Sequence, residues 1–307
     1  MKKENQTGLR TKMSFLPDSV KIVEVGPRDG LQSITQTIST EDKVIYIDLL
    51  TDAGFQEIEV TSFVSPKWIP QLADSEDVST QIDRNDSITY TALVPNLRGL
   101  ENAIKSDYNS VAVFTAASET FSKKNINCSI DESILRFNEM MELWEKHSIR
   151  VRGYISTVWH CPYEGSIKTE KVMDIIAKLF DLGIQEISLG DTIGKATADE
   201  VRYSLEKILN RWDPAHFALH MHDTFDLAEG NIKAAMEFEL TTFDSSTGGI
   251  GGCPYAPGSS GNIASEKIVS LCDLIGLETG IDKNKLEKAT NFIQNIVNKE
   301  SVTHGED

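Results

Sequence analysis

Short runs rich in β-branched residues recur along the chain, and segments with helical spacing of their apolar positions separate them. The runs lie at residues 20–26, 57–63, 88–94, 110–117, 150–158, 186–192, 217–223 and 241–249. Runs of this length and composition are typical of buried β-strands. The pattern therefore predicts eight strands with helical segments between them.

The intervening segments carry the start and stop signals of helices. Residues 40–54 begin with Thr40 as the expected N-cap, have acidic residues in the first turn and stop at a glycine. Residues 169–183 repeat this design, and a further helix follows from Thr197. Residues 283–299 predict one additional helix, packed outside the fold or over one end of it.

Alternation of strands and helices predicts parallel strands joined by crossover helices. Eight such units without a Pro- or Gly-rich linker favour one closed (β/α)₈ barrel of the TIM type over two open sheets. A doubly wound sheet is the alternative, but it would need a GxGxxG turn where residues 26–30 read GPRDG. We therefore expect an α/β fold with a single barrel and C-terminal helix over residues 20–298. A flexible tail, 1–19, and a short tail, 299–307, would flank it.

Charge and cysteine content narrow the functional classes. The 307-residue chain has a net charge of −17 and an isoelectric point near 4.8, which argues against a basic nucleic-acid-binding face. No apolar run approaches the roughly 18 residues that a membrane span requires. Four cysteines without a CxxC spacing or a preceding secretory segment indicate reduced thiols. We expect a cytoplasmic protein without nucleic-acid or membrane partners; the mitochondrial matrix is the alternative compartment.

Polar residues collect where the predicted strands end, which is where a barrel places its catalytic groups. His220 and His222 are two positions apart on one strand, so their side chains point the same way. Two imidazoles and a carboxylate such as Asp29 form a facial metal site, to which Asn262 could add an amide oxygen. This donor set suits Mg²⁺ or Mn²⁺, with Zn²⁺ as an alternative. The competing interpretation is a pair of ordinary core or surface histidines.

Three more charged residues lie at strand positions. Glu59 lies inside an apolar run, where a carboxylate needs a partner or a raised pKa, and Arg28 is the expected partner. Arg28 and Asp29 could instead form only a salt-bridged turn. Asp191, in the sequence GDTIG, could be a helix N-cap as well as a site residue.

A glycine-rich stretch follows the eighth predicted strand. Residues 248–262 contain six glycines with a single thiol, Cys253, among them. Glycine-rich loops are mobile or tightly turned, and such loops often cover active sites. A cysteine held there could donate a proton or act as a nucleophile. The alternative is a flexible loop with an incidental thiol.

Seven motifs along the chain resemble those of the 3-hydroxy-3-methylglutaryl-CoA lyases, a family of TIM-barrel metallolyases. They occur in the family's order and are EVGPRDGLQ, TSFVSPKWIPQ, KKNINCSI, CPYEG, SLGDTIG, HMHDT and GGCPYAPGSSGN. The resemblance covers about residues 20–298. It implies a metal-dependent retro-Claisen cleavage of 3-hydroxy-3-methylglutaryl-CoA to acetyl-CoA and acetoacetate, as in leucine breakdown and ketone-body formation. It also implies a divalent metal, Mg²⁺ or Mn²⁺, an acyl-CoA substrate and a homodimer.

The resemblance assigns roles residue by residue. The implied metal ligands are Asp29, His220, His222 and Asn262. The implied catalytic and substrate residues are Arg28 for the enolate, Cys253 as proton donor, Glu59 and Asp191 as acidic supports, and Gln32 near the substrate. Asp29, a histidine or a water molecule at the metal are the candidates for the initial base. From charge alone, we expect the CoA arm to lie across the barrel mouth near basic residues such as Lys123 and Lys124.

The sequence departs from the family pattern at four places: Ser33-Ile34, Trp159-His160, Phe225-Asp226 and Thr247-Gly248. We expect Trp159 and His160 to crowd the barrel mouth and alter the acyl pocket, and Asp226 to add a carboxylate beside the metal strand. A same-mechanism lyase for another 3-hydroxyacyl-CoA is therefore an alternative. A non-catalytic relative that binds metal or CoA is a second one.

Overall fold

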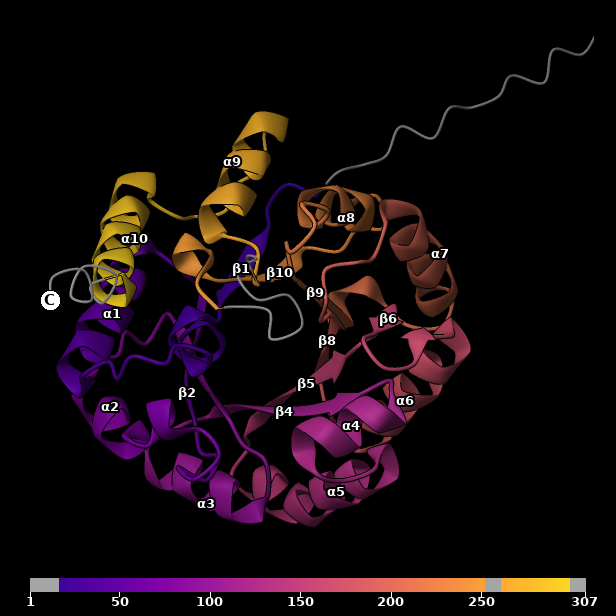
Figure 1. Ribbon diagram of the computed structural model, residues 1–307, viewed down its shortest axis with the longest axis horizontal. Coiled ribbons are helices and arrows are strands. Elements are labelled where there is room, and N and C mark those ends of the chain that lie inside the picture. Colours follow the sequence, from indigo (N-terminus) through magenta and orange to yellow (C-terminus); the bar gives the residue numbers. More distant parts are fainter. Residues whose placement is uncertain (1–16, 252–260, 299–307) are drawn as a thin grey trace, which may run out of the picture.

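The computed structural model describes residues 17–251 and 261–298, and eight parallel strands in this part of the chain close into a barrel (Figure 1). The barrel strands are β1 (Lys21–Glu24), β2 (Glu57–Ser62), β3 (Thr89–Leu93), β4 (Ser110–Ala116), β5 (Arg150–Ser156), β8 (Glu186–Asp191), β9 (Phe217–Met221) and β10 (Thr242–Ser245). Each predicted run contains one of them, so the prediction of a (β/α)₈ barrel is confirmed.

The strands follow one another around the barrel in chain order, and β1 pairs with β10 to close it. The register at the closure aligns Lys21 with Thr242 and Glu24 with Ser245. Since all strands run in parallel, their carboxyl ends meet at one end of the barrel, the barrel mouth. Side chains that follow the strands are therefore gathered at this end.

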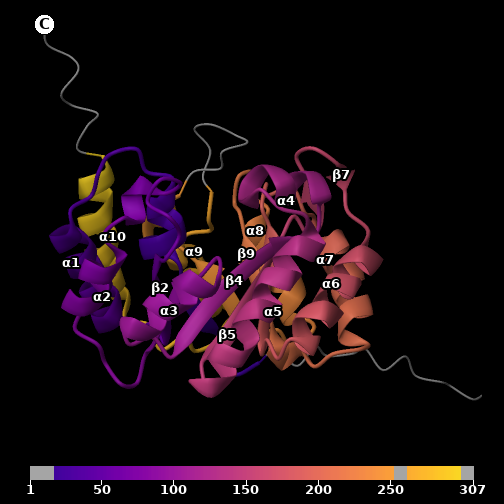
Figure 2. The ribbon, with the colours of Figure 1, turned by 90° about the horizontal axis from the view of Figure 1, so that it is seen from below.

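Ten helices in the described residues surround the strands (Figures 1 and 2). They are α1 (Thr40–Ala53), α2 (Ser75–Gln81), α3 (Leu97–Lys105), α4 (Glu119–Ile126), α5 (Ile130–Lys146), α6 (Thr169–Asp181), α7 (Ala198–Leu209), α8 (Ala228–Met236), α9 (Ser265–Ile275) and α10 (Lys283–Val297). The main apolar core joins buried side chains of the strands to those of the helices. No helix in residues 17–251 or 261–298 has the length and apolar character to cross a membrane.

The expected N-cap of α1 was wrong by one residue. Ser39, not Thr40, is the N-cap, and its hydroxyl accepts a hydrogen bond from the Asp42 amide at 3.1 Å. Thr40 is the first helical residue and donates instead to Asp74 Oδ2 at 2.7 Å. The predicted stop is correct, because Gly54 ends the helix in the left-handed conformation.

The predicted additional helix is α10. Its buried residues, Leu286, Ala289, Ile293 and Ile296, recur at spacings of three and four, so they form one apolar face. This helix packs beside α1 on the outside of the barrel, as Figure 1 shows. Of the two positions considered from the sequence, the outer one is therefore correct.

Short elements outside the main pattern shape the barrel mouth. A π-helical turn, η1 (Gly26–Gly30), follows β1, and a 3₁₀ turn, η4 (Thr247–Gly249), follows β10. A small antiparallel hairpin, β6 (His160–Cys161) with β7 (Gly165–Ser166), follows β5. Of two further 3₁₀ turns, η2 (Pro70–Leu72) follows β2, whereas η3 (Pro214–His216) directly precedes β9 and lies at the opposite end of the barrel. Only glycine fits at the start of η1, since a Cβ on Gly26 would overlap the Tyr46 hydroxyl and the Glu24 carboxylate.

Candidate active site

A carboxylate and two imidazoles meet at the barrel mouth. Asp29 comes from η1, His220 from β9 and His222 from the segment directly after β9. One potential ligand atom from each residue lies within 4.8 Å of those of the other two. The two imidazole rings are 5.4 Å apart between centroids, and His220 Nε2 lies 3.9 Å from Asp29 Oδ2. The structure thus brings together the three residues that the sequence suggested as metal ligands.

Asn262 joins this cluster. It forms an isolated β-bridge with His222, and its Nδ2 donates to Asp29 Oδ2 at 2.8 Å. Its Oδ1 and the Nδ1 of His222 are buried without a hydrogen-bond partner in the described residues. Buried polar atoms without partners are rare, and they often mark a site that holds an ion or a water molecule. Nitrogen and oxygen donors around one carboxylate fit a divalent cation.

The protonation states of Asp29 and His222 suit metal binding, whereas the pKa of His220, despite its burial, is raised by the hydrogen bond to Asp244 and by the charges of Asp29 and Asp244. Burial raises the pKa of Asp29, but the positive charge of Arg28, with a further contribution from His220, outweighs burial and holds this pKa well below its usual range. Burial, with the neighbouring His220, lowers the pKa of His222 to about 4. At neutral pH, Asp29 is therefore a carboxylate and His222 is neutral, which are the forms that coordinate cations.

Arg28 lies beside the metal cluster and is held from two sides. Its Nε donates to Glu59 Oε1, and its Nη1 donates to Asp29 Oδ1 at 2.5 Å. Although burial disfavours the charged form, the charges of Glu59 and Asp29 raise the pKa of Arg28. The Glu59–Arg28 partnership expected from the sequence is therefore present. The sequence did not indicate Tyr154, whose hydroxyl donates to Glu59 Oε2 at 2.5 Å and whose ring lies 5.6 Å from the guanidinium carbon.

The remaining expected site residues are Asp191, Gln32 and Cys253. Asp191 is fully buried at the end of β8, where its carboxylate accepts hydrogen bonds from the amides of Ala196 at 2.8 Å and Lys195 at 3.2 Å. It therefore fastens the loop before α7, and burial raises its pKa to about 6. Gln32 is exposed just after η1. Cys253 lies outside the described residues.

The structure contradicts the expected positions of Trp159 and His160. Trp159 is buried in the main core, and its Nε1 donates to Ser204 Oγ of α7 at 2.8 Å. His160 Nε2 lies 3.0 Å from Glu200 Oε1 on the same helix. Trp159 therefore faces α7 rather than the barrel mouth, and His160 contacts the first turn of the same helix.

Asp226 is also placed differently from the expectation. Its carboxylate is 88% exposed and pairs with Lys267 Nζ of α9 at 3.0 Å. Lys267 also donates to Asp223 Oδ2 at 2.6 Å. The extra carboxylate thus belongs to an ion pair with α9 and is not part of the metal cluster.

We expect the double substitution Trp159→Leu with His160→Gly to lower stability without changing acyl preference. Removing the buried indole and its hydrogen bond should cost about 2–4 kcal/mol of the free energy of unfolding. Urea unfolding measures this loss. The ratio of kcat/KM values for 3-hydroxy-3-methylglutaryl-CoA and its 3-ethyl homologue should stay at the wild-type value. A shift in that ratio would show that these residues reach the acyl pocket after all.

Glu24 holds the two turns at the barrel mouth together, and sequence reasoning missed it. Its carboxylate is fully buried and accepts from the Gly26 amide at 2.8 Å, from Thr247 Oγ1 at 2.6 Å and from Ser265 Oγ at 2.7 Å. One carboxylate therefore links β1 and η1 to η4 and α9. Burial raises its pKa from the ordinary value near 4.5 to about 7, although the hydrogen bonds oppose this shift.

The raised pKa of Glu24 should make stability depend on pH. Because the folded protein binds the proton more tightly than the unfolded chain, Glu24 destabilises the fold progressively as pH rises from about 4.5 to about 7. As the pH rises across this range, the unfolding free energy of Glu24→Gln should increase relative to that of the wild type by on the order of 3 kcal/mol. Urea titrations at both ends of the range measure the difference. The exposed Glu139→Gln is the control, and a parallel pH response of all three proteins would contradict the assignment.

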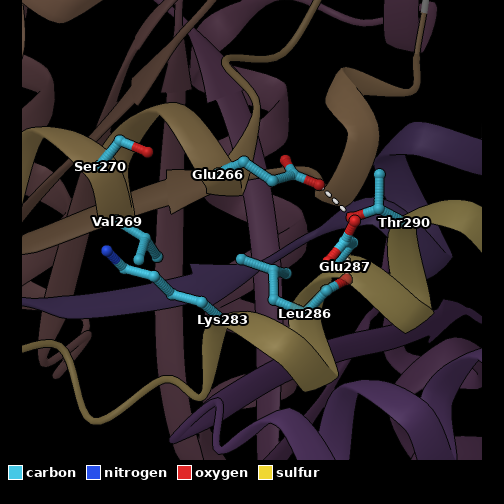
Figure 3. Close-up of a pocket in the computed structure, with 7 residues that line it drawn as sticks. All are labelled: Glu266, Val269, Ser270, Lys283, Leu286, Glu287 and Thr290. Atoms are coloured by element: carbon cyan, nitrogen blue, oxygen red, sulfur yellow. Dashed lines mark hydrogen bonds between the residues drawn. The ribbon is translucent and has the colours of Figure 1, made fainter.

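A shallow pocket of about 150 Å³ lies away from this cluster, between α9 and α10 (Figure 3). Its lining residues are Glu266, Val269, Ser270, Lys283, Leu286, Glu287 and Thr290. Glu266 accepts a hydrogen bond from Thr290 Oγ1 and another from the Gly248 amide at 3.0 Å. None of the expected site residues lines this pocket, so we do not place the active site there.

Comparison with known proteins agrees with this geometry. The family model described as HMGL-like matches residues 19–293. The chain belongs to the HMGL-like family. A relative from Macaca fascicularis named hydroxymethylglutaryl-CoA lyase, mitochondrial, is 46% identical over 289 residues, which cover 94% of this chain and 89% of that protein.

Two solved structures of family members superpose on nearly the whole chain. The hydroxymethylglutaryl-CoA lyase from Pseudomonas aeruginosa has a TM-score of 0.90 and 44% identity, with 95% of each chain covered. An HMG-CoA lyase from Acinetobacter baumannii, solved with coenzyme A and 3-methylmalate, has a TM-score of 0.87 and 35% identity, covering 97% of this chain and 98% of that chain. The HMGL-like barrel is thus shared over its full extent.

Proposed function

We propose that this protein cleaves 3-hydroxy-3-methylglutaryl-CoA to acetyl-CoA and acetoacetate and that it requires Mg²⁺ or Mn²⁺. The observation that carries the proposal is the convergence of Asp29, His220 and His222 beside a buried, fixed Arg28 at the barrel mouth. The relatives named as hydroxymethylglutaryl-CoA lyases supply the substrate, and the coenzyme A in one of their structures supplies the thioester carrier.

The metal would be held by Asp29, His220 and His222, with Asn262 as a further ligand. When bound, a divalent cation supplies Lewis-acid chemistry that makes the tertiary 3-hydroxyl of the substrate easier to deprotonate. The cluster sits where Asn262 and His222 have buried polar atoms without protein partners in the described residues. The mixed nitrogen and oxygen donor set is the support for naming Mg²⁺ or Mn²⁺ as this cation.

The reaction is a retro-Claisen cleavage. A base takes the hydroxyl proton, and Asp29, a histidine of the cluster or a water molecule beside them are the candidates for it. C3 then becomes the ketone carbon of acetoacetate, and the C2–C3 bond breaks. Its electron pair moves to the thioester end as the enolate of acetyl-CoA. A proton delivered to C2 then completes acetyl-CoA, and we assign this proton to Cys253 or to a water molecule near it.

Arg28 is the group best placed to stabilise the enolate oxygen. Glu59 and Asp29 hold its guanidinium, so it does not need to reorganise when negative charge develops. Preorganised donors of this kind are usually the largest single contribution to catalysis. We assign Glu59 and Asp191 supporting roles, Glu59 through Arg28 and Asp191 through the loop before α7. Gln32 would contact the substrate at the rim.

The proposal also covers the binding of the CoA arm and the oligomeric state. Lys123 and Lys124 lie in the last turn of α4, and both are exposed. Exposed ammonium groups are suited to the phosphates of the CoA arm, which would cross the barrel mouth at this point. We propose a homodimer, as the resemblance to the family implies.

Quantifying both products from purified protein tests the proposed reaction. With 3-hydroxy-3-methylglutaryl-CoA and Mg²⁺ or Mn²⁺, acetoacetate and acetyl-CoA should appear in equal amounts. Release of free CoA without acetoacetate would indicate thioester hydrolysis and would refute carbon–carbon cleavage. Turnover only of a homologous thioester would keep the reaction but change the substrate.

A further inference from the structure

A chain of ion pairs inside the barrel leads to one face of His220. Arg152 on β5 is fully buried and donates through Nη2 to Asp244 Oδ1 on β10 at 2.6 Å. These two strands are not neighbours in the barrel, so the pair crosses the interior rather than lying along the sheet. Asp244 in turn lies 3.2 Å from His220 Nδ1.

The two nitrogens of His220 have different surroundings. Nδ1 faces Asp244 Oδ2, whereas Nε2 lies on the side of Asp29, at 3.9 Å from its Oδ2. The register explains this arrangement, because Asp244 and His220 are paired positions on the adjacent strands β10 and β9. A carboxylate that accepts Nδ1–H leaves the lone pair of Nε2 available for a cation.

Asp244 is held in this position by more than His220. Its Oδ2 also accepts from Ser188 Oγ at 2.8 Å, and its Oδ1 is occupied by Arg152. Arg152 is itself fixed by Glu186 Oε1 at 2.5 Å and by the Tyr154 hydroxyl at 2.7 Å. A carboxylate with this many donors is fixed in orientation, so it can select one tautomer of the adjacent imidazole.

His222 offers a contrast within the same cluster. Its Nδ1 has no hydrogen-bond partner in the described residues, so no protein acceptor there selects its tautomer. The two histidines are therefore not equivalent: one is oriented by the barrel interior and the other is not.

We propose that Asp244 is a positioning residue that fixes His220 as the Nδ1–H tautomer, with Nε2 facing the metal site, and that Arg152 anchors Asp244 for this task. The proposal deepens the proposed function and rests on the metal site described there. Arg152 is also linked to Arg28 through Tyr154 and Glu59. One buried guanidinium therefore supports both the metal cluster and the arginine beside it.

The tautomer can be read in the metal-free wild-type protein. Nitrogen-15 NMR of histidine-labelled protein, recorded where the His220 shifts no longer change with rising pH and the ring is neutral, distinguishes a protonated Nδ1 from a protonated Nε2. The His220 signals are assigned by their loss in His220→Gln. A protonated Nδ1 is expected, and a protonated Nε2 would overturn the proposal. This measurement does not depend on whether the protein binds a metal or turns over substrate.

Asp244→Asn tests the consequence for the metal. An amide at this position can donate to Nδ1, which places the proton on Nε2 and blocks coordination. We expect Mn²⁺ affinity to fall by about 10–100-fold, as for other partners of metal-bound histidines. Glu57→Gln is the control, because Glu57 belongs to the same interior ion network, with Arg150 at 2.8 Å and Lys21 at 3.1 Å, but does not contact His220.

The two variants separate positioning from general support of the fold. Glu57→Gln should retain Mn²⁺ affinity within about threefold, because Glu57 pairs with Arg150 and Lys21 and contacts neither Asp244 nor His220. A folded Asp244→Asn with wild-type Mn²⁺ affinity would overturn the proposal, as would equal losses in the two variants. If Asp244→Asn does not fold, the NMR measurement decides alone. Failure of the wild type to bind Mn²⁺ would refute the proposed function, and the tautomer result would still decide on Asp244.

Discussion

Replacing Arg28 with glutamine is expected to lower kcat by on the order of 10³-fold, because the enolate loses its preorganised cation. Metal affinity should be maintained or rise, since Arg28 is no metal ligand and its positive charge lies 2.5 Å from Asp29. Steady-state kinetics at saturating Mn²⁺ and calorimetric Mn²⁺ binding measure the two effects. This combination distinguishes loss of enolate stabilisation from loss of the metal.

Two further variants make the Arg28 result specific. Arg28→Lys keeps the charge beside Glu59 but loses the fork of donors, so we expect a smaller but still large loss of kcat, about 10²-fold. Arg98→Gln removes an exposed arginine of α3 and should leave kcat unchanged. Wild-type kcat in a folded Arg28→Gln protein would show that another group stabilises the enolate.

Replacing His222 with alanine is expected to weaken Mn²⁺ binding by more than about 100-fold, because loss of an outer partner of a metal ligand alone costs 10–100-fold. Turnover should fall in parallel at limiting Mn²⁺. Electron paramagnetic resonance of free Mn²⁺ during titration gives the affinity directly.

The His222 result needs a control for histidine loss in general. His147→Ala is suitable, because His147 is exposed at the end of α5 and far along the chain from the cluster. Its Mn²⁺ affinity should equal that of the wild type. Tight Mn²⁺ binding by His222→Ala would place the metal elsewhere and would contradict the ligand set.

Much of the fold was accessible from the sequence because strand–helix alternation is a local pattern. Each apolar run contained a barrel strand, and the glycine that ends α1 was read correctly. The N-cap of α1 was missed by one residue because Ser39 and Thr40 are adjacent hydroxyl residues, and only the three-dimensional position of Asp74 shows where Thr40 donates.

The sequence predicted the part of the candidate site whose residues lie in one short motif. His220 and His222 share a strand, so their common direction follows from the two-residue period. Asp244, Tyr154 and Arg152 were not found, because they meet only when strands distant along the chain close the barrel. The one signal available in the sequence was a charged residue inside an apolar run, such as Asp244, because a buried charge needs a partner.

Trp159 and His160 show the opposite error. Their place after a barrel strand suggested the mouth, but a position along the chain does not determine the direction of a side chain. Both side chains instead contact α7, Trp159 through Ser204 and His160 through Glu200. The expectation of an altered acyl pocket therefore has no support from these two residues.

Metal dependence of turnover tests the central claim most directly. Protein stripped with EDTA and freed of the chelator should not release acetoacetate from 3-hydroxy-3-methylglutaryl-CoA. Titration with Mn²⁺ should restore release and saturate near one equivalent for each chain. Undiminished release by protein whose metal content is zero by elemental analysis would contradict the account.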